Sequence, residues 1–482
     1  MTPVVLLASL ALTACAVGPD FRTPENPPGH LLNAQPEDRA PIVLRSPDGW
    51  WWQQFDDPVL DDLMGRALAS NLDLKLAVDR VLTARAAFSG AETDLAPHVP
   101  LQAGYVHSRE QEPGFGTQRY DARSATLGLD AAWELDLFGH VRRSVEAARG
   151  DLAAEQEDLE AVRITVAAEV ARNYFLLRSA QRQSRVARDN LANQRETVRL
   201  TSLRYEAGRG TELDVQSSRA RLKATEATLP ALRTAEAAAR YRLAVLLGQR
   251  PGAIDGALDL REIPAYAKAL PIGEDGDDIG RLLRNRPDVR AAERRLAAAT
   301  ARVGIVTADL FPRVTVTGFV GFLSGDLGRP FSTSSGSDAR AWSIAPTLSW
   351  PAFDYGSVRA RLRASRANAD AALVAYEKTV LNALEETENA FTGYRDQQAR
   401  LASLVEQAAA SHRAADLAAV QYREGVSDFL TLLDAQRTQL SAESAVAESE
   451  GEVNASVVTI YKVLGGVGQP GAAPPVARNQ SP

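Results

Sequence analysis

The sequence predicts a mixed α+β fold that is mainly helical and contains two copies of one structural unit. Three observations indicate this. The chain matches itself at an offset of 217 residues, and each copy contains a proline-free stretch of about 70 residues that is rich in alanine and charged side chains. Before each of these stretches, apolar and polar residues alternate over short segments. Alternation is typical of strands and three-four spacing of helices, so each unit combines strands with long helices.

The duplication is clearest in two segments, "RYEAGRGTELDV" at 204–215 and "QYREGVSDFLTL" at 421–432. Further pairs at the same offset are Trp133 and Trp350, Gly139 and Gly356, Leu247 and Leu464, and Gly248 and Gly465. Upstream the offset becomes 215, as between Asp73 and Asp288. A period of this length predicts two copies of a whole structural unit, with loops of unequal length near 100–130 and 315–345.

These matches predict the organisation of the chain. We expect a signal peptide at 1–14, an N-terminal segment at 15–57, a first repeat at 58–265, a second repeat at 266–467 and a flexible tail at 468–482. The first repeat contains short helices, strands 99–109 and 123–135, a long helix 139–207 and a helix 211–247. The second contains helices within 279–310, strands 313–323 and 341–350, a long helix 356–424 and a helix 428–464.

The N-terminus has the pattern of a secreted lipoprotein. Residues 4–14, "VVLLASLALTA", are too few to span a bilayer and fit a signal peptide, although no Lys or Arg precedes them. They end in "LTAC", which resembles the bacterial lipobox, so we predict a covalent lipid on Cys15 and no other cofactor. A buried or free cysteine is the alternative. Ala16 rather than Asp follows the cysteine, which favours sorting to the outer membrane.

Composition argues against several classes of function. The net charge of -7 argues against a nucleic-acid partner, and a single cysteine excludes an internal disulfide. The five histidines are scattered, so a histidine-rich metal site is not expected. The acidic segment "EDGDDIG" at 274–280 lacks the ligand spacing of a calcium loop. Because no catalytic constellation occurs, we do not expect an enzyme.

The strand segments alternate as membrane strands do. In 125–135 the apolar positions are Ala125, Leu127, Leu129, Ala131, Trp133 and Leu135, and in 342–350 they are Trp342, Ile344, Pro346, Leu348 and Trp350. Such segments with Trp at their ends fit a β-barrel with a wet interior; a soluble hairpin packed on a core is the alternative. Four strands do not close a barrel, so copies must combine, two giving eight strands or three giving twelve.

The two proline-free stretches predict very long helices, each about 100 Å in length. Heptad spacing indicates coiled-coil packing for Leu191, Val198 and Tyr205, and again for Tyr394, Leu401, Ala408, Ala415 and Tyr422. Gly208 and Gly425 follow the helices and predict a left-handed stop, after which each chain returns as an antiparallel helix. The two stops are therefore hairpin tips.

Several motifs together resemble the outer-membrane factor family of TolC and OprM, in its NodT-like efflux lipoprotein branch. They are "LTACAVGPDF", "WELDLFG", "RYEAGRGTELDV", "RNRPDV", "PAFDYG", "YREGVSDFLTLLDAQRTQL" and "YKVLGG", and they cover essentially the whole chain. The resemblance implies a homotrimer with a twelve-stranded barrel in the Gram-negative outer membrane, a periplasmic α-helical barrel and an equatorial region that includes the lipidated segment 15–57. It also implies a periplasmic adaptor and an inner-membrane pump of the resistance-nodulation-division class as partners. Residues Tyr205, Gly208, Tyr422 and Gly425 at the tips are then candidates for adaptor docking.

The resemblance also implies a gate at the periplasmic mouth, formed by Leu430, Thr431 and Asp434. Leu430 and Asp434 are four residues apart and share a helix face, and the repeat counterpart of Asp434 is the uncharged Ser217. Three copies of Asp434 around an axis would hold cations and repel anions. The alternative is an exposed aspartate paired with Arg437 or Thr438.

The expected function is a passive exit duct that exports drugs, toxic small molecules or metal ions. Export of a polypeptide by a type I secretion system is the alternative, and a structural or adhesive coiled-coil lipoprotein is a third. The lipobox favours efflux over protein secretion, and the strand pairs disfavour the third hypothesis. The substrate is not expected to be encoded in this chain, since specificity resides in the pump.

Overall fold

The computed structural model describes residues 16–25, 42–44, 50–111, 119–254, 258, 270–272, 283–284, 286–324 and 339–466. The signal peptide, Cys15, the acidic segment 274–280 and the tail 468–482 lie outside these residues. The chain divides into two compact units, each drawn from both repeats. The first, here called the strand unit, is Met1–Pro24, Asp79–Gln156 and Ala291–Lys378, and the second, the hairpin unit, is Glu25–Val78, Glu157–Arg290 and Thr379–Pro482.

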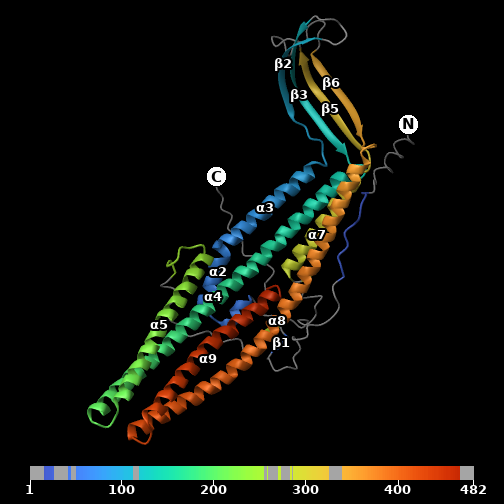
Figure 1. Ribbon diagram of the computed structural model, residues 1–482. Coiled ribbons are helices and arrows are strands. Elements are labelled where there is room, and N and C mark those ends of the chain that lie inside the picture. The colour runs from blue at the N-terminus through green and yellow to red at the C-terminus, as the bar shows by residue number, and fades with distance from the viewer. Residues whose placement is uncertain are drawn as a thin grey trace. The chain divides into compact units, whose positions relative to one another are not determined.

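The strand unit contains one antiparallel sheet in the order β2-β3-β5-β6 (Figure 1). Its strands are β2 (Leu101–Gln111), β3 (Arg119–Leu135), β5 (Arg313–Ser324) and β6 (Arg340–Ser349). Three of them match the predicted strands to within two residues. β3 begins four residues before the predicted 123, because its polar first residues pair with β2 as far as Gln111 and Arg119.

One face of this sheet is apolar across all four strands. The register places Leu101 beside Leu129, Leu129 beside Val320, and Val320 beside Trp342. These side chains are exposed; Trp342 is 77% and Leu101 is 69% accessible. A hairpin packed on a soluble core would bury such a row. None of the described residues covers this row of side chains, which favours the interpretation of the alternating segments as membrane strands.

Both repeats fix the ends of their second strands in the same way. The indole Nε1 of Trp133 donates to the carbonyl of Leu95 at 3.1 Å, and that of Trp350 donates to the carbonyl of Leu310 at 3.1 Å. The two tryptophans are 217 residues apart and the two carbonyls 215, so the structure retains both offsets of the duplication.

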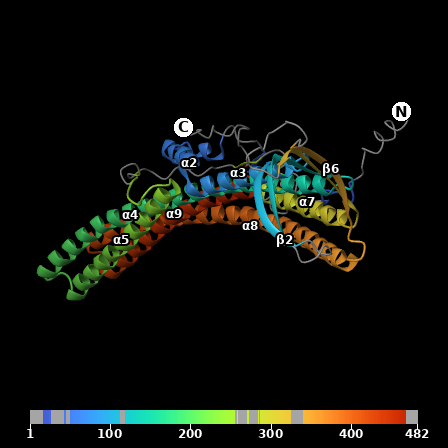
Figure 2. The same ribbon diagram turned by 90° about the horizontal axis from the view of Figure 1, so that it is seen from above.

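The hairpin unit contains two antiparallel helix pairs (Figures 1 and 2). The first hairpin joins α4 (His140–Glu206) to α5 (Glu212–Leu246), and the second joins α8 (Tyr355–Glu424) to α9 (Phe429–Val463). The ends of these four helices lie within two residues of the predicted ones. α3 (Leu72–Thr93), α7 (Pro287–Ala308), α4 and α8 contribute residues to both units. None of the helices in the described ranges has an apolar stretch long enough to cross a membrane.

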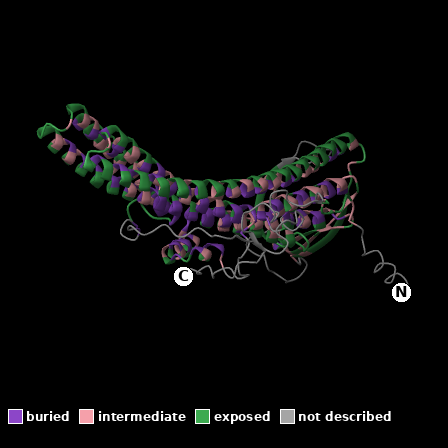
Figure 3. Ribbon diagram, turned by 90° about the horizontal axis from the view of Figure 1, so that it is seen from below, coloured by how far each residue is buried: buried purple, intermediate pink, exposed green. Residues whose placement is uncertain are grey.

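The hairpin turns have the geometry that the sequence predicts. Gly208 has φ +68° and Gly425 has φ +78°, the left-handed region that ends a helix and favours glycine. The returning helices begin at side-chain caps. Thr211 accepts a hydrogen bond from the backbone of Asp214, and Asp428 accepts one from the backbone of Thr431. Exposed residues predominate at both tips (Figure 3).

The predicted helical segment 279–310 is interrupted in the structure. Leu283 and Arg284 are helical, but Arg286 is not, and α7 begins at Pro287. The residue before a proline avoids the helical conformation, whereas proline itself suits the first helical position. Arg286 is buried, donates to the carbonyl of Val463 at 3.1 Å and pairs with Asp288.

Three short elements were not predicted. The 3-10 helix η1 (Trp51–Phe55) precedes α2 (Pro58–Ser70), and strand β1 (Ile42–Leu44) pairs in parallel with β4 (Leu270–Ile272). The aromatic residues of η1 enter the core of the hairpin unit, where Trp51 stacks on Tyr461 at 5.4 Å between ring centroids. The core thus joins the N-terminal segment to α4 and α9.

Candidate functional site at the hairpin tips

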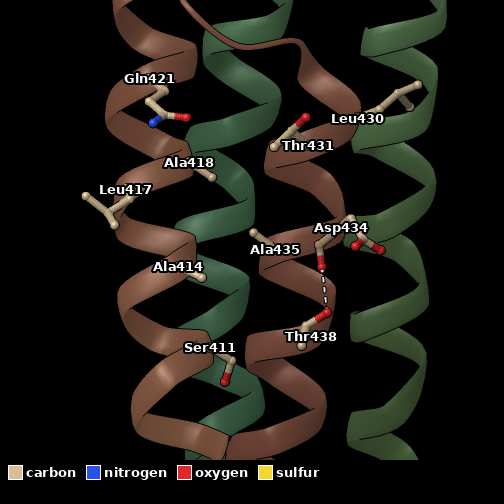
Figure 4. A pocket seen from close by; sticks show the side chains of 10 residues that line it. All are labelled: Ser411, Ala414, Leu417, Ala418, Gln421, Leu430, Thr431, Asp434, Ala435 and Thr438. Carbon is tan, nitrogen blue, oxygen red and sulfur yellow. Dashed lines mark hydrogen bonds between the residues drawn. The ribbon is translucent and has the colours of Figure 1, made fainter.

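The second hairpin contains a groove of about 700 Å³ between α8 and α9 (Figure 4). It is lined by Ser411, Ala414, Leu417, Ala418, Gln421, Leu430, Thr431, Asp434, Ala435 and Thr438. The structure therefore brings the three predicted gate residues together in one surface. In the view of Figure 4, Thr431 lies toward α8, whereas Leu430 and Asp434 lie on the far side of α9.

The first turn of α9 fixes the positions of these residues. Asp428 accepts hydrogen bonds from the Thr431 hydroxyl at 2.6 Å and from the Thr431 amide at 2.9 Å. These two bonds lower the pKa of the Asp428 carboxyl, so it remains ionised as the helix cap. Leu430 lies in the first turn of α9, and its side chain is 57% exposed. Thr431 thus serves as a cap partner as well as a groove residue.

Asp434 contacts both Arg437 and Thr438, the two partners of the alternative in which it is an exposed, paired aspartate. Its Oδ1 lies 2.6 Å from Nη2 of Arg437, and its carbonyl oxygen accepts a hydrogen bond from the Thr438 hydroxyl at 3.0 Å (Figure 4). The two charged side chains are 64% and 66% exposed, so the ion pair is solvated and weak. Arg437 therefore only partly compensates the carboxylate, and the gate role of Asp434 stays a prediction.

The two tip tyrosines differ, although the repeat makes them equivalent. Tyr422 is buried beneath Arg204, whose guanidinium carbon lies 4.6 Å from the ring centroid and whose Nη1 donates to the Tyr422 carbonyl at 2.7 Å. Burial raises the pKa of Tyr422. Tyr205 is 47% exposed. Sequence reasoning missed this difference; its signal is that the repeat counterparts of Arg204 and Phe429 are Gln421 and Glu212.

The second hairpin also contains a polar cluster that sequence reasoning missed. His412 Nδ1 lies 3.2 Å from Glu443 Oε1, and Asn190 of α4 donates to the same carboxylate at 3.0 Å. The repeat counterparts of His412 and Glu443 are Arg195 and Glu226, which also form an ion pair, at 3.8 Å. Among the residues that the structure describes, His, Cys, Asp and Glu form no group of three that suits a metal ion.

In the described residues an apolar sheet face is uncovered, and the same chain forms long antiparallel helix hairpins, a combination that is typical of a membrane channel protein. A family model described as outer membrane efflux protein matches residues 63–249 and 279–466, once in each repeat. The chain belongs to this family, and the resemblance inferred from its motifs is confirmed.

Relatives extend the match to nearly the whole chain. Nodulation protein T of Rhizobium leguminosarum bv. trifolii is 29% identical, over 91% of this chain and 92% of the relative. The toluene efflux pump outer membrane protein TtgC of Pseudomonas putida is 31% identical over 95% of each. The structure of the outer-membrane channel OprN is 47% identical, with a TM-score of 0.89 over 95% of this chain and all of that one. The chain is an outer-membrane channel of the efflux type that extends into the periplasm.

Proposed function

We propose that three copies of this chain form the exit duct through which an inner-membrane pump expels drugs, toxic small molecules or metal ions. The observation that carries this proposal is the four-stranded sheet. Its apolar face is uncovered, and in the described chain β2 and β6 each pair on one side only. Unpaired edges are not tolerated in lipid, so other copies must complete the sheet. Twelve strands leave a channel, whereas eight are filled by side chains.

The partners in this proposal are a periplasmic adaptor and a pump of the resistance-nodulation-division class. Tyr205, Gly208 and Gly425 are exposed at the tips and form the proposed docking surface for the adaptor, whereas Tyr422 is buried and supports its turn from beneath. The name of TtgC as a toluene efflux protein supports a small-molecule cargo over a polypeptide. The duct itself is passive, and the pump selects the substrate.

The gate in this proposal is a threefold ring of Leu430, Thr431 and Asp434. The exposed Leu430 narrows the opening, and the exposed Asp434 carboxylates attract cations. Because Arg437 lies beside each carboxylate, the ring contains paired charges rather than bare ones.

The anchor in this proposal is a lipid on Cys15. Growth with a radioactive fatty acid should label the wild-type protein and leave Cys15→Ser unlabelled. If the variant retained the label, the proposed lipid anchor would be wrong. The proposed duct would stand, since the sheet supplies its own apolar face.

The test of the duct is its assembly in detergent. Amine-reactive cross-linking of the purified full-length chain should produce bands up to a covalent trimer and none beyond it. The same protein should form stable single channels in planar bilayers. A chain that remains monomeric, or that stops at the dimer, contradicts the proposal.

A further inference from the structure

The two repeats differ in charge where the second strand leads into the long helix. In the second repeat β6 leads into α8 (Figure 1), and the first twelve residues of α8, 355–366, contain four arginines and no acidic residue. Their counterparts in the first repeat, 138–149, contain three arginines and one glutamate. The first repeat therefore shows what the second has changed.

The first repeat compensates its cations within the protein. Arg142 pairs with Asp136 at 3.0 Å. Arg143 is buried and pairs with Asp20 and Glu146, both at 2.7 Å. The start of α4 thus has acidic partners at hand for the two arginines of its first turn.

The second repeat lacks these acidic partners. Phe353 has the position of Asp136, and Arg363 has the position of Glu146. The Phe353 side chain is fully exposed, as is part of Trp350 at the end of the sheet. Both changes remove a negative charge, and one of them places an exposed aromatic ring between the last strand and α8.

Three of the four arginines form a stripe along one face of α8. Arg359, Arg363 and Arg366 are four and three residues apart, a spacing that puts them on one helix face, and all three are exposed. Arg361 lies on another face, 3.6 Å from Asp309. Among the residues that the structure describes, Arg363 and Arg366 form no ion pair. We call the three exposed residues the arginine stripe.

The stripe leans toward the sheet. Side chains of a helix tilt toward its N-terminus, and the N-terminus of α8 adjoins β6. Arg359 follows this rule, because its guanidinium carbon lies 5.2 Å from the centroid of the Tyr355 ring, one turn nearer the sheet. The arginine side chains therefore extend in the direction of the membrane strands.

The stripe is also close enough to the bilayer to meet lipid headgroups. The apolar side chains end at Phe353, so the edge of the hydrocarbon lies near the start of α8. At about 1.5 Å per residue, the stripe runs from about 6 Å to about 16 Å along the helix. The headgroup layer is about 5–8 Å thick. The stripe thus begins in this layer, and its far end lies within about 10 Å of it, the screening length in 0.1 M salt.

The face that carries the stripe is covered in the first repeat and open in the second. Residues 16–20 lie on the start of α4, where they share an arginine partner with Glu146. A Cβ on Gly139 would lie 2.7 Å from this segment, whereas a Cβ on its counterpart Gly356 would meet nothing within 4 Å. Cys15 directly precedes the segment, so the lipid proposed there lies on the same side. The stripe then faces lipid and not the interior of the duct.

We propose that the arginine stripe binds the phosphates of anionic phospholipids in the periplasmic leaflet of the outer membrane, with the Phe353 ring inserted beside them. Guanidinium groups suit phosphate oxygens, since their planar donors can bind two at once. Aromatic rings are typical of the boundary between headgroups and hydrocarbon. Only the side on which the stripe lies rests on the lipid proposed for Cys15. The trimer is not required.

This binding holds the two long helices at the membrane by different means. The start of α4 is fastened to the N-terminal segment and its proposed covalent lipid, whereas the start of α8 is held by free phospholipids. Each repeat therefore has one attachment to the same leaflet, and the second depends on the lipid composition.

Native mass spectrometry of the full-length protein, mixed with equal amounts of phosphatidylglycerol and zwitterionic phosphatidylethanolamine, tests the proposal. The wild type should retain several-fold more phosphatidylglycerol. Arg359→Gln/Arg363→Gln/Arg366→Gln should lose this preference. Lysine at the same three positions should keep most of it, because the charges remain.

Two further variants separate the stripe from a general effect of charge. Arg199→Gln/Arg209→Gln/Arg219→Gln removes three exposed arginines of the first hairpin and should keep the wild-type lipid ratio. Phe353→Asp removes no arginine. It restores the acid that pairs with an arginine six residues later in the first repeat, so it should lower the preference, whereas Phe353→Leu should keep it.

The outcomes are distinct. Equal lipid ratios in the wild type and the stripe variant with glutamine would overturn the proposal, and so would an equal loss in the hairpin control. If the stripe variant keeps its lipid ratio but no longer forms trimers in amine cross-linking, the stripe contacts a second copy and not lipid. If Cys15→Ser keeps its fatty-acid label, the anchor is wrong, and a lipid preference that depends on the stripe still supports this inference.

Discussion

His412 of α8 lies 3.2 Å from Glu443 of α9, the contact that Arg195 makes with Glu226 at 3.8 Å one repeat earlier. The two pairs differ in chemistry. A guanidinium is a permanent cation, whereas an imidazole ring has two nitrogens that each donate or accept a hydrogen bond. The amide of Gln439 lies 2.8 Å from both His412 Nδ1 and Glu443 Oε1, and bridges them. The second hairpin thus has a hydrogen-bonded cluster where the first has a permanent ion pair.

The first prediction is that the contacts of His412 hold the second hairpin together. His412 contacts Glu443 on α9 and Asp416 on its own helix, at 3.6 Å. His412→Ala removes both contacts and the bridge through Gln439, so α9 should open more readily. An exposed pair of this kind is worth about 0.2–1 kcal/mol. Hydrogen exchange of α9, measured at one fixed pH, should be faster in the variant than in the wild type.

The first hairpin provides the matched control. Arg195→Ala removes the equivalent contact with Glu226, so it should speed hydrogen exchange in the first hairpin and leave α9 unchanged. Equal exchange of α9 in the wild type and in His412→Ala would contradict this role of the histidine.

The second prediction concerns the gate residues. Leu430→Ala/Asp434→Ala should raise single-channel conductance and lower cation selectivity, because it removes three apolar and three charged side chains from the proposed ring. The matched change Leu213→Ala/Ser217→Ala in the first hairpin should have much less effect. Arg437→Ala should leave conductance similar but raise cation selectivity, since it exposes the Asp434 carboxylate. Equal effects of the two double substitutions would show that the gate lies elsewhere in the channel.

The third prediction is a loss of stability in alkali that depends on Tyr461. Burial raises the pKa of Tyr461 to about 12, although its hydrogen bond with Gln54 opposes the shift. An unfolded tyrosine ionises near pH 10. The neutral Tyr461 side chain therefore contributes fully to the free energy of unfolding below pH 10, and this contribution is lost as pH rises through 12. The difference of about 2 between the folded and unfolded pKa of Tyr461 corresponds to about 3 kcal/mol of unfolding free energy.

Thermal unfolding in detergent, measured as a function of pH, checks this. Tyr461→Phe keeps the ring that stacks on Trp51 and should resist alkali better than the wild type. A parallel decline of the two proteins above pH 10 would assign the effect to other groups.

The fourth prediction concerns the close approach of β3 and β5. Gly128 and Gly321 are register partners, and a Cβ on Gly128 would lie 2.5 Å from the Phe319 ring and 2.8 Å from the carbonyl oxygen of Val320. Gly128→Ala should therefore destabilise the sheet by about 1–3 kcal/mol. Gly104 on β2 has open space beside it, so Gly104→Ala should change the melting temperature little. Similar melting temperatures for the two variants would show that Phe319 moves aside freely.

The long elements could be predicted from the sequence because their ends have strong local causes. Gly208 and Gly425 end helices by backbone conformation, and Asp428 begins α9 by capping it. The elements that escaped prediction have no such signal. Three-residue strands such as Ile42–Leu44 are too short to show alternation, and the first residues of β3 are polar on both faces. Tertiary contacts, not local pattern, form these elements.

The residues of the candidate site could be proposed from the sequence, but their contacts could not. The gate residues could be aligned with a family, and the structure brings them into one groove. The difference between Tyr205 and Tyr422 depends on which hairpin lies beside each, and a repeat conceals that information because it makes the two positions look alike. The partner Arg437 was visible as an alternative, three residues along the same helix from Asp434.

The hydrogen bonds of Trp133 and Trp350 affect how the sheet adjusts to bilayer thickness. Indoles at a membrane surface usually donate to water or lipid headgroups and so set the depth of a protein in the bilayer. Here both indoles donate to the backbone that precedes the strands, at Leu95 and Leu310. These rings are fixed to the polypeptide rather than to the lipid surface. Hydrophobic mismatch at this rim must therefore be met by deformation of the lipid, not by tilting of the tryptophans.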